Sequence, residues 1–115
     1  MYDNLYCKVF IDSNVEYEEL LLMIMKYVGV EKKSFGYVAA EWCDIFINKN
    51  KEYSEEQYLQ DSDNFLYWKY YLDIEPIDIK EEAYIEKISD LLAYLKQYCQ
   101  GVKPTCDFED ELTKL

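Results

Sequence analysis

Carboxylates are the residue type in this chain that could most readily do chemistry. The stretch TCDFEDEL at 105–112 holds four of them, and a second acidic segment, LDIEP, lies at 72–76. Clustered carboxylates can bind hard divalent cations, act as general acids and bases, or dock a basic partner. They can also form a solvated rim without a function. No EF-hand loop or other metal-binding spacing surrounds them, and the alternatives therefore stay open.

Residue types that are missing exclude much other chemistry. The chain has no His, and all 12 of its cations are Lys. This removes the commonest general base, the Ser–His and Cys–His nucleophile pairs, and the bidentate Arg clamp for phosphate. The four cysteines, at 7, 43, 99 and 106, include no C-x-x-C pair and are predicted to be small buried hydrophobes. We therefore predict that the chain is not an enzyme and uses no cofactor.

The net charge limits the possible partners. The chain has 24 carboxylates and a formal net charge of −12, which steers it towards cationic partners. Nucleic acid and anionic membranes are disfavoured, because Lys and Arg supply most of the affinity for phosphate. The opening residues, MYDNLYCKVF, do not resemble a signal peptide, and the longest apolar run, LLLMIM, is too short to span a bilayer. We expect a cytoplasmic protein.

Hydrophobic periodicity predicts six secondary-structure elements. In chain order they are a strand at 5–12, a helix at 15–28, strands at 35–50 and 64–76, a helix at 78–98 and a strand at 103–109. Ser13 with Glu16, and Asp78 with Glu81, fit capping boxes, and Gly29 and Gly101 fit helix ends. The polar segment at 49–63 is long for a loop and has room for a short helical turn.

This order of elements predicts a single α+β domain covering residues 1–115. The economical fold for β-α-β-β-α-β is the ferredoxin-like plait, a four-stranded antiparallel sheet in the order 4-1-3-2 with two helices on one face. The predicted inner face of the sheet consists of Cys7, Val9, Ile11, Cys43, Ile45, Ile47, Trp68, Tyr70, Leu72, Cys106 and Phe108.

The opposite sheet face would be rich in aromatic rings, namely those of Tyr6, Phe10, Trp42, Phe46, Phe65, Tyr67 and Tyr71. Such an area exceeds the apolar patch that a monomer normally exposes. A protein partner, a second copy of the chain or the 49–63 loop is expected to cover it. Stacking of RNA bases is disfavoured, because carboxylates outnumber lysines on this face.

The plait also predicts an acidic edge, because the ends of its third and fourth strands lie near the start of the first. The residues predicted to bind a partner combine aromatic rings with this acidic rim: Phe46, Tyr67, Tyr71, Asp73, Glu75, Asp107, Glu109 and Asp110. We expect no metal among them.

The chain resembles a family of small bacterial proteins, mostly of unassigned function. The shared features are YCKVFID at 6–12, FLYWKYYLDIEP at 65–76 and, most specifically, CDFEDEL at 106–112. Some such proteins resemble immunity proteins that are encoded beside polymorphic toxins. The resemblance implies direct binding and neutralisation of a cognate, basic toxin. The alternative is a homodimer that binds a small molecule or a divalent metal on its open sheet face.

Overall fold

Five antiparallel strands and four α-helices make up the part of the chain that the structure, a computed structural model, describes: residues 2–30 and 37–112. The elements are β1 (Cys7–Asp12), α1 (Tyr17–Val28), β2 (Tyr37–Ala39), β3 (Cys43–Lys49), α2 (Glu55–Gln60), the 3-10 helix η1 (Phe65–Tyr67), β4 (Tyr70–Pro76), α3 (Glu81–Lys96), β5 (Gly101–Thr105) and α4 (Glu109–Leu112).

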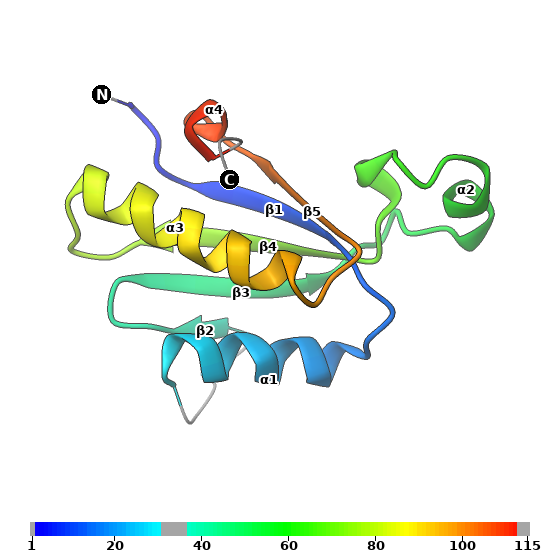
Figure 1. Cartoon of the computed structure of the whole chain (residues 1–115), viewed down its shortest axis with the longest axis horizontal. Coiled ribbons are helices and arrows are strands. Elements are labelled where there is room, and N and C mark those ends of the chain that lie inside the picture. Colours follow the sequence, from blue (N-terminus) through cyan, green and yellow to red (C-terminus); the bar gives the residue numbers. More distant parts are fainter. Residues whose placement is uncertain (1, 31–36, 113–115) are drawn as a thin grey trace.

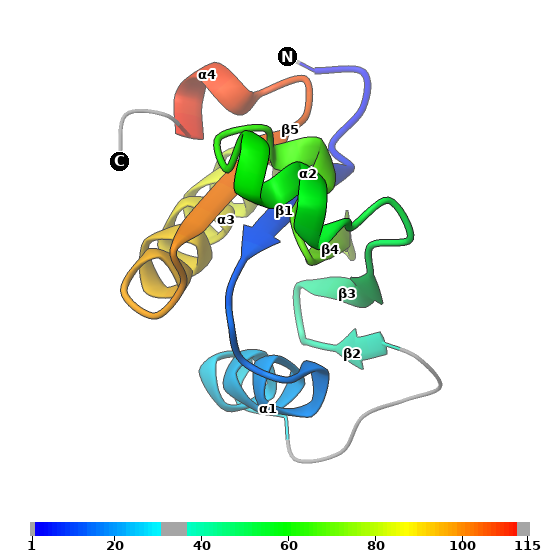
Figure 2. The same ribbon diagram turned by 90° about the vertical axis from the view of Figure 1, so that its right-hand side faces the viewer.

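The strands form one sheet in the order β2-β3-β4-β1-β5. Helices α1 and α3 cover one face of this sheet, whereas α2 lies beyond one of its ends (Figures 1 and 2). The core lies between the sheet and the two long helices, and burying each large apolar side chain there contributes roughly 1.5–3 kcal/mol. Its fully buried members include Val9, Ile11, Leu20, Ile24, Ile45, Leu72, Ile74, Tyr84, Ile88, Leu91, Leu95 and Phe108.

The predicted ferredoxin-like plait with four strands and two helices is wrong. The sheet has a fifth strand, β2, and the chain has two further helices, α2 and α4. The pattern at 35–50 predicts one strand, but the chain turns at Glu41 and Trp42, where the Ala40 N–H donates to the Cys43 carbonyl at 2.9 Å. Residues 37–49 therefore form the β2–β3 hairpin, and residues 35–36 lie outside the described ranges.

Two other predicted strands have different bounds. The strand predicted at 64–76 begins only at Tyr70, because Asn64 caps η1 by accepting a hydrogen bond from the Leu66 N–H at 3.2 Å. The strand predicted at 103–109 is β5, which ends at Thr105 and is followed by α4. Trp68 is consequently absent from the inner face. Phe108 is buried as predicted, but it enters the core from the turn before α4.

The helix ends agree only in part with their predicted signals. Gly29 is the C-cap of α1 with φ 78°, as predicted. Neither capping box forms: the Ser13 hydroxyl accepts from the Val15 N–H at 3.2 Å, and Glu16 is the N-cap of α1. Likewise α3 begins after Lys80, and Asp78 has a positive φ of 49°. The predicted short helical turn within 49–63 is confirmed as α2.

Gly101 is the first residue of β5, and its predicted role as the end of the preceding helix is wrong, because α3 ends at Lys96. A Cβ at Gly101 would lie 2.5 Å from Cη2 of Trp68, whose indole N–H donates to the Ser62 carbonyl at 2.7 Å. We expect Gly101→Ala to lower the free energy of unfolding by about 1–3 kcal/mol, because the extra carbon must displace the ring. Urea unfolding followed by tryptophan fluorescence measures this effect.

A matched control for Gly101→Ala is Gln100→Ala, which alters an exposed neighbour. It should change the unfolding free energy by less than about 0.5 kcal/mol. An unchanged urea midpoint for Gly101→Ala would show that Trp68 does not press on this position.

Candidate functional site

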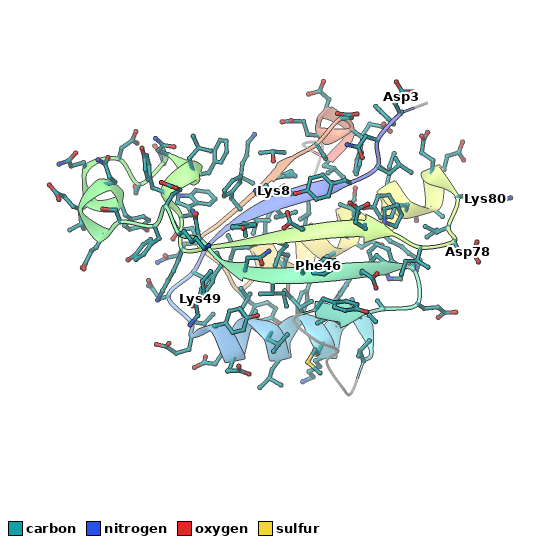
Figure 3. All side chains as sticks on the ribbon, turned by 180° about the vertical axis from the view of Figure 1, so that it is seen from behind. Asp3, Lys8, Phe46, Lys49, Asp78 and Lys80 are labelled. Carbon is teal, nitrogen blue, oxygen red and sulfur yellow. The ribbon has the colours of Figure 1, made fainter. Side chains whose placement is uncertain are left out.

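The sheet face that α1 and α3 leave uncovered, called the open face below, presents its side chains in cross-strand rows (Figure 3). Directly opposed residues on neighbouring strands point to the same face and lie within contact distance of one another. Two rows cross the open face, one made of Thr105, Lys8, Asp73, Phe46 and Tyr37, and the next of Lys103, Phe10, Tyr71 and Asn48.

One end of the open face is covered by the chain itself. Phe10 is only 8% exposed, because the Phe65 ring of η1 packs on it with centroids 5.1 Å apart. Trp68 lies on the same side, against Gly101. Trp42, which was predicted to lie on this face, instead packs edge-on against Tyr84 at 6.0 Å. The aromatic area of the open face is therefore smaller than the sequence predicts.

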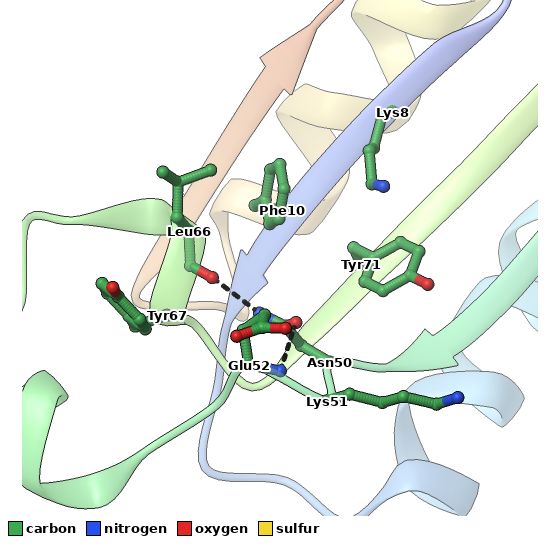
Figure 4. Close-up of a pocket in the computed structure, with 8 residues that line it drawn as sticks. All are labelled: Lys8, Phe10, Asn50, Lys51, Glu52, Leu66, Tyr67 and Tyr71. Atoms are coloured by element: carbon green, nitrogen blue, oxygen red, sulfur yellow. Dashed lines mark hydrogen bonds between the residues drawn. The ribbon is translucent and has the colours of Figure 1, made fainter.

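A groove of about 510 Å³ lies where η1 meets the open face (Figure 4). Two of the predicted partner-binding residues, Tyr67 and Tyr71, line it. Leu66 at its wall is 53% exposed. The complete lining consists of Lys8, Phe10, Asn50, Lys51, Glu52, Leu66, Tyr67 and Tyr71.

A single side chain, that of Asn50, fixes the η1 wall of this groove. Its amide nitrogen donates to the carbonyls of Leu66 at 2.9 Å and Trp68 at 2.6 Å. Its backbone N–H donates to the Lys69 carbonyl at 2.9 Å, and its side-chain oxygen accepts from the Glu52 N–H at 3.0 Å. The sequence prediction does not include Asn50. The sequence feature that could have identified Asn50 is its place directly after a strand, where an Asn side chain often forms hydrogen bonds with nearby backbone groups.

The ammonium group of Lys8 lies over two aromatic rings of the groove, although the whole chain is acidic. Lys8 Nζ lies 4.2 Å from the ring centroid of Tyr71 and 5.7 Å from that of Phe10. Such cation–π contacts stabilise by about 0.5–1 kcal/mol at exposed sites. The groove therefore suits an apolar or aromatic side chain next to an acceptor group.

Asp73, at the centre of the open face, is held by neutral donors. The Tyr6 hydroxyl donates a short hydrogen bond to Oδ1, and the Asn48 amide donates to Oδ2 at 3.1 Å. Burial, followed by the hydrogen bond to Asp73, raises the pKa of Tyr6. Asp73 thus belongs to a network within the sheet. Phe46 lies beside it, 37% exposed and stacked on Tyr37 with centroids 4.9 Å apart.

The remaining predicted acidic residues lie away from the groove. Glu75 is exposed on β4 opposite Asp44. Asp107 follows β5, and Glu109 and Asp110 begin α4, which lies at the end of the sheet opposite η1 and α2 (Figure 1). Glu109 forms an ion pair with Lys103 at 3.8 Å. The structure therefore does not gather the predicted residues into one site, because only Tyr67 and Tyr71 line the groove.

The described residues gather no set of metal ligands, and the thiol of Cys43 is not suited to nucleophilic chemistry. Across 2–30 and 37–112, no three or more Cys, Asp or Glu residues are placed so that they could hold a metal ion. Cys43 is fully buried, and that burial raises its thiol pKa to about 12. A thiol that stays protonated at neutral pH is a poor nucleophile.

Several tyrosines with raised pKa values make the chain sensitive to alkali, among them Tyr2 and Tyr6. The Tyr2 hydroxyl donates to Glu111, and this bond raises the pKa of Tyr2 from 10.0 to about 12. Tyr6 is shifted in the same direction. Because the folded chain holds these protons more tightly than the unfolded chain, the associated stability is present below pH 10 and is lost as the pH rises through about 12.

Alkaline titration checks this expectation. The tyrosinate absorbance of the native chain should rise at higher pH than that of the chain in urea, with the difference concentrated between pH 10 and 12. Superimposable titration curves would show that the Tyr2–Glu111 and Tyr6–Asp73 bonds do not persist in solution.

Comparison with known proteins adds no assignment. Neither family models, nor curated proteins, nor solved structures give a significant match to this chain. Among the helices of the described ranges, none combines the length and the apolar character needed to cross a membrane.

Proposed function

We propose that this chain is a protein-binding module that docks its partner through the groove on the open face. The observation that carries the proposal is the groove itself, in which Tyr67, Tyr71 and the 53%-exposed Leu66 surround a recess of about 510 Å³. Interfaces concentrate their affinity in a few aromatic and apolar anchors in such recesses. The Asn50 bonds hold the wall in place before binding, which reduces the entropy lost on association.

The partner that we propose is a basic toxin domain, which the chain neutralises by occlusion. The resemblance to immunity proteins suggests this class, and the net charge of −12 supports it. Carboxylates occupy the first turns of all four α-helices, at Glu18, Glu19, Glu55, Glu56, Glu81, Glu82, Glu109, Asp110 and Glu111. Charge distributed in this way accelerates the approach of a cationic partner, and the groove then supplies short-range contacts.

Co-expression tests the proposed function. The product of the neighbouring gene, which the proposal expects to carry a basic toxin domain, is produced in a sensitive host with and without this chain. Growth should be restored by the wild-type chain and by Leu22→Ala, which alters a side chain that is 60% exposed on α1. Growth should be restored poorly by Leu66→Ala combined with Tyr67→Ala. Failure of the wild-type chain to protect, or equal protection by all three, would contradict the proposal.

A second candidate is binding of a small molecule in the same groove. The volume of the groove falls within the range of roughly 300–1,000 Å³ that is usual for small-molecule sites. In this alternative a second copy of the chain closes the open side of the groove. Light scattering distinguishes the two candidates, because a monomer at micromolar concentration leaves the groove open and removes the basis for this alternative.

A further inference from the structure

Two cysteines from opposite ends of the chain meet beside the edge strand β5. The β1–β5 register pairs Lys8 with Thr105 and Val9 with Pro104. Cys7 and Cys106 are the next residues beyond the Lys8–Thr105 pair, and Cys106 lies in the bend that follows β5. Cys7 belongs to the buried core, and Cys106 is partly buried and packs against that core.

The two thiols are close enough to influence each other's ionisation. Their interaction lowers the pKa of Cys106 and raises that of Cys7. The two cysteines also differ in access, because Cys7 is completely buried whereas Cys106 is partly exposed. Cys106 is therefore the thiol that a small oxidant reaches first and that ionises more readily. All four cysteines are free in the structure.

The backbone geometry is suited to a bond between them. Directly opposed residues of an antiparallel pair have Cα atoms about 4.5–5.5 Å apart, within the range of about 4.4–6.8 Å that disulfides span. Cys7 and Cys106 directly follow the Lys8–Thr105 pair, which is the last pair of the β1–β5 ladder.

We propose that Cys7 and Cys106 are a redox modification site that forms a reversible disulfide in response to a peroxide. The Cys106 thiolate attacks one peroxide oxygen, which breaks the O–O bond, gives a sulfenic acid and releases hydroxide. The Cys7 sulfur then attacks the Cys106 sulfur and displaces the hydroxyl group as water. In total the two thiols lose two electrons and two protons, and hydrogen peroxide becomes two waters. A dithiol reductant restores both thiols by exchange.

The disulfide would fasten the C-terminal segment to the first strand. Cys106 directly precedes Asp107, Phe108 and α4, and it therefore controls the attachment of the acidic rim. Joining positions 7 and 106 closes nearly the whole chain into one loop, which restricts the unfolded state. The oxidised chain should therefore resist urea to a higher concentration than the reduced chain.

Peptide mapping after mild oxidation tests the proposal. The intact chain receives near-equimolar hydrogen peroxide, excess thiol is blocked, and trypsin is added without reductant. Trypsin cuts after Lys8 and Lys96 but not between Lys103 and Pro104, so Cys7 and Cys106 fall in different peptides. Cys99 shares the peptide of Cys106, and mapping is therefore repeated with Cys99→Ser.

The expected product is one linked pair of peptides, lighter by two hydrogens than the separate peptides, which dithiothreitol separates again. In Cys7→Ser, the Cys106 sulfenic acid should persist and react with dimedone. Cys43 and Cys99 serve as matched controls, since one is buried and the other is partly exposed. Oxidation of either control before Cys106, or oxidised Cys106 with Cys7 still free in the wild-type chain, would overturn the proposal.

Discussion

Replacing Phe108 with alanine lowers the free energy of unfolding by about 3–5 kcal/mol, the range for removing a buried aromatic ring. Phe108 is 0% exposed although it stands within the most acidic stretch of the sequence. Its ring contacts those of Tyr84 at 5.8 Å and Tyr2 at 5.9 Å. Leu112, one helical turn further on, is also buried. Urea unfolding followed by circular dichroism measures the loss.

The matched control is Asp107→Ala, which removes an exposed carboxylate next to Phe108. It should change the unfolding free energy by less than about 0.5 kcal/mol. This contrast would establish that the buried ring of Phe108 stabilises the fold, whereas the neighbouring carboxylate of Asp107 contributes little. Similar costs for the two substitutions would mean that the segment is only loosely attached to the fold.

Replacing Tyr67 with alanine weakens binding of the proposed toxin partner about 30-fold, which corresponds to about 2 kcal/mol. Tyr67 projects into the groove from η1, a wall that Asn50 already holds in place. Truncating the ring removes contact area in the recess while the fold keeps its core, because no residue of η1 is buried. Titration calorimetry with the purified toxin domain measures the dissociation constant.

Leu22→Ala is the control for this measurement. Leu22 is 60% exposed on α1, in the helical layer behind the sheet. Its truncation should leave the dissociation constant unchanged within about twofold, the scale of a near-neutral surface contact. Loss of affinity in Leu22→Ala, with no loss in Tyr67→Ala, would move the interface from the open face to the helices.

Much of the core could be predicted from periodicity alone. The alternation in β1, β3 and β4 correctly assigns Cys7, Val9, Ile11, Cys43, Ile45, Ile47, Tyr70 and Leu72 to the buried face. The class, α+β, follows from the same pattern. These predictions succeed because the pleat sends alternate residues to opposite faces, whichever strands pair.

The arrangement of the strands could not be predicted from periodicity, because the differences from the predicted plait arise at turns. The β2–β3 hairpin turns at Glu41 and Trp42, which lack the Gly, Asn or Asp that usually mark such a turn. The strand propensity of FLYW at 65–68 is overridden by Asn64 and Asn50, which bond the η1 backbone. Long-range contacts of this kind leave no periodic trace in the sequence.

The residue types of the candidate site could be predicted from the sequence, but which of these residues lie together could not. Tyr67 and Tyr71 do share one surface, in the groove. Asp107, Glu109 and Asp110 were placed beside them by extending a strand beyond Thr105, where the chain instead turns into α4. The position of the Lys8 ammonium group over the Tyr71 ring could not be predicted, because it depends on how β1 and β4 pair.

Amide chemical-shift mapping of the isotope-labelled chain, during titration with the purified toxin domain, shows whether the partner docks in the groove of the open face. The largest shifts are expected at Phe10, Leu66, Tyr67 and Tyr71, with smaller ones along the acidic helix ends. Shifts confined to the outer surfaces of α1 and α3, with the groove residues unchanged at saturation, would contradict docking in the groove.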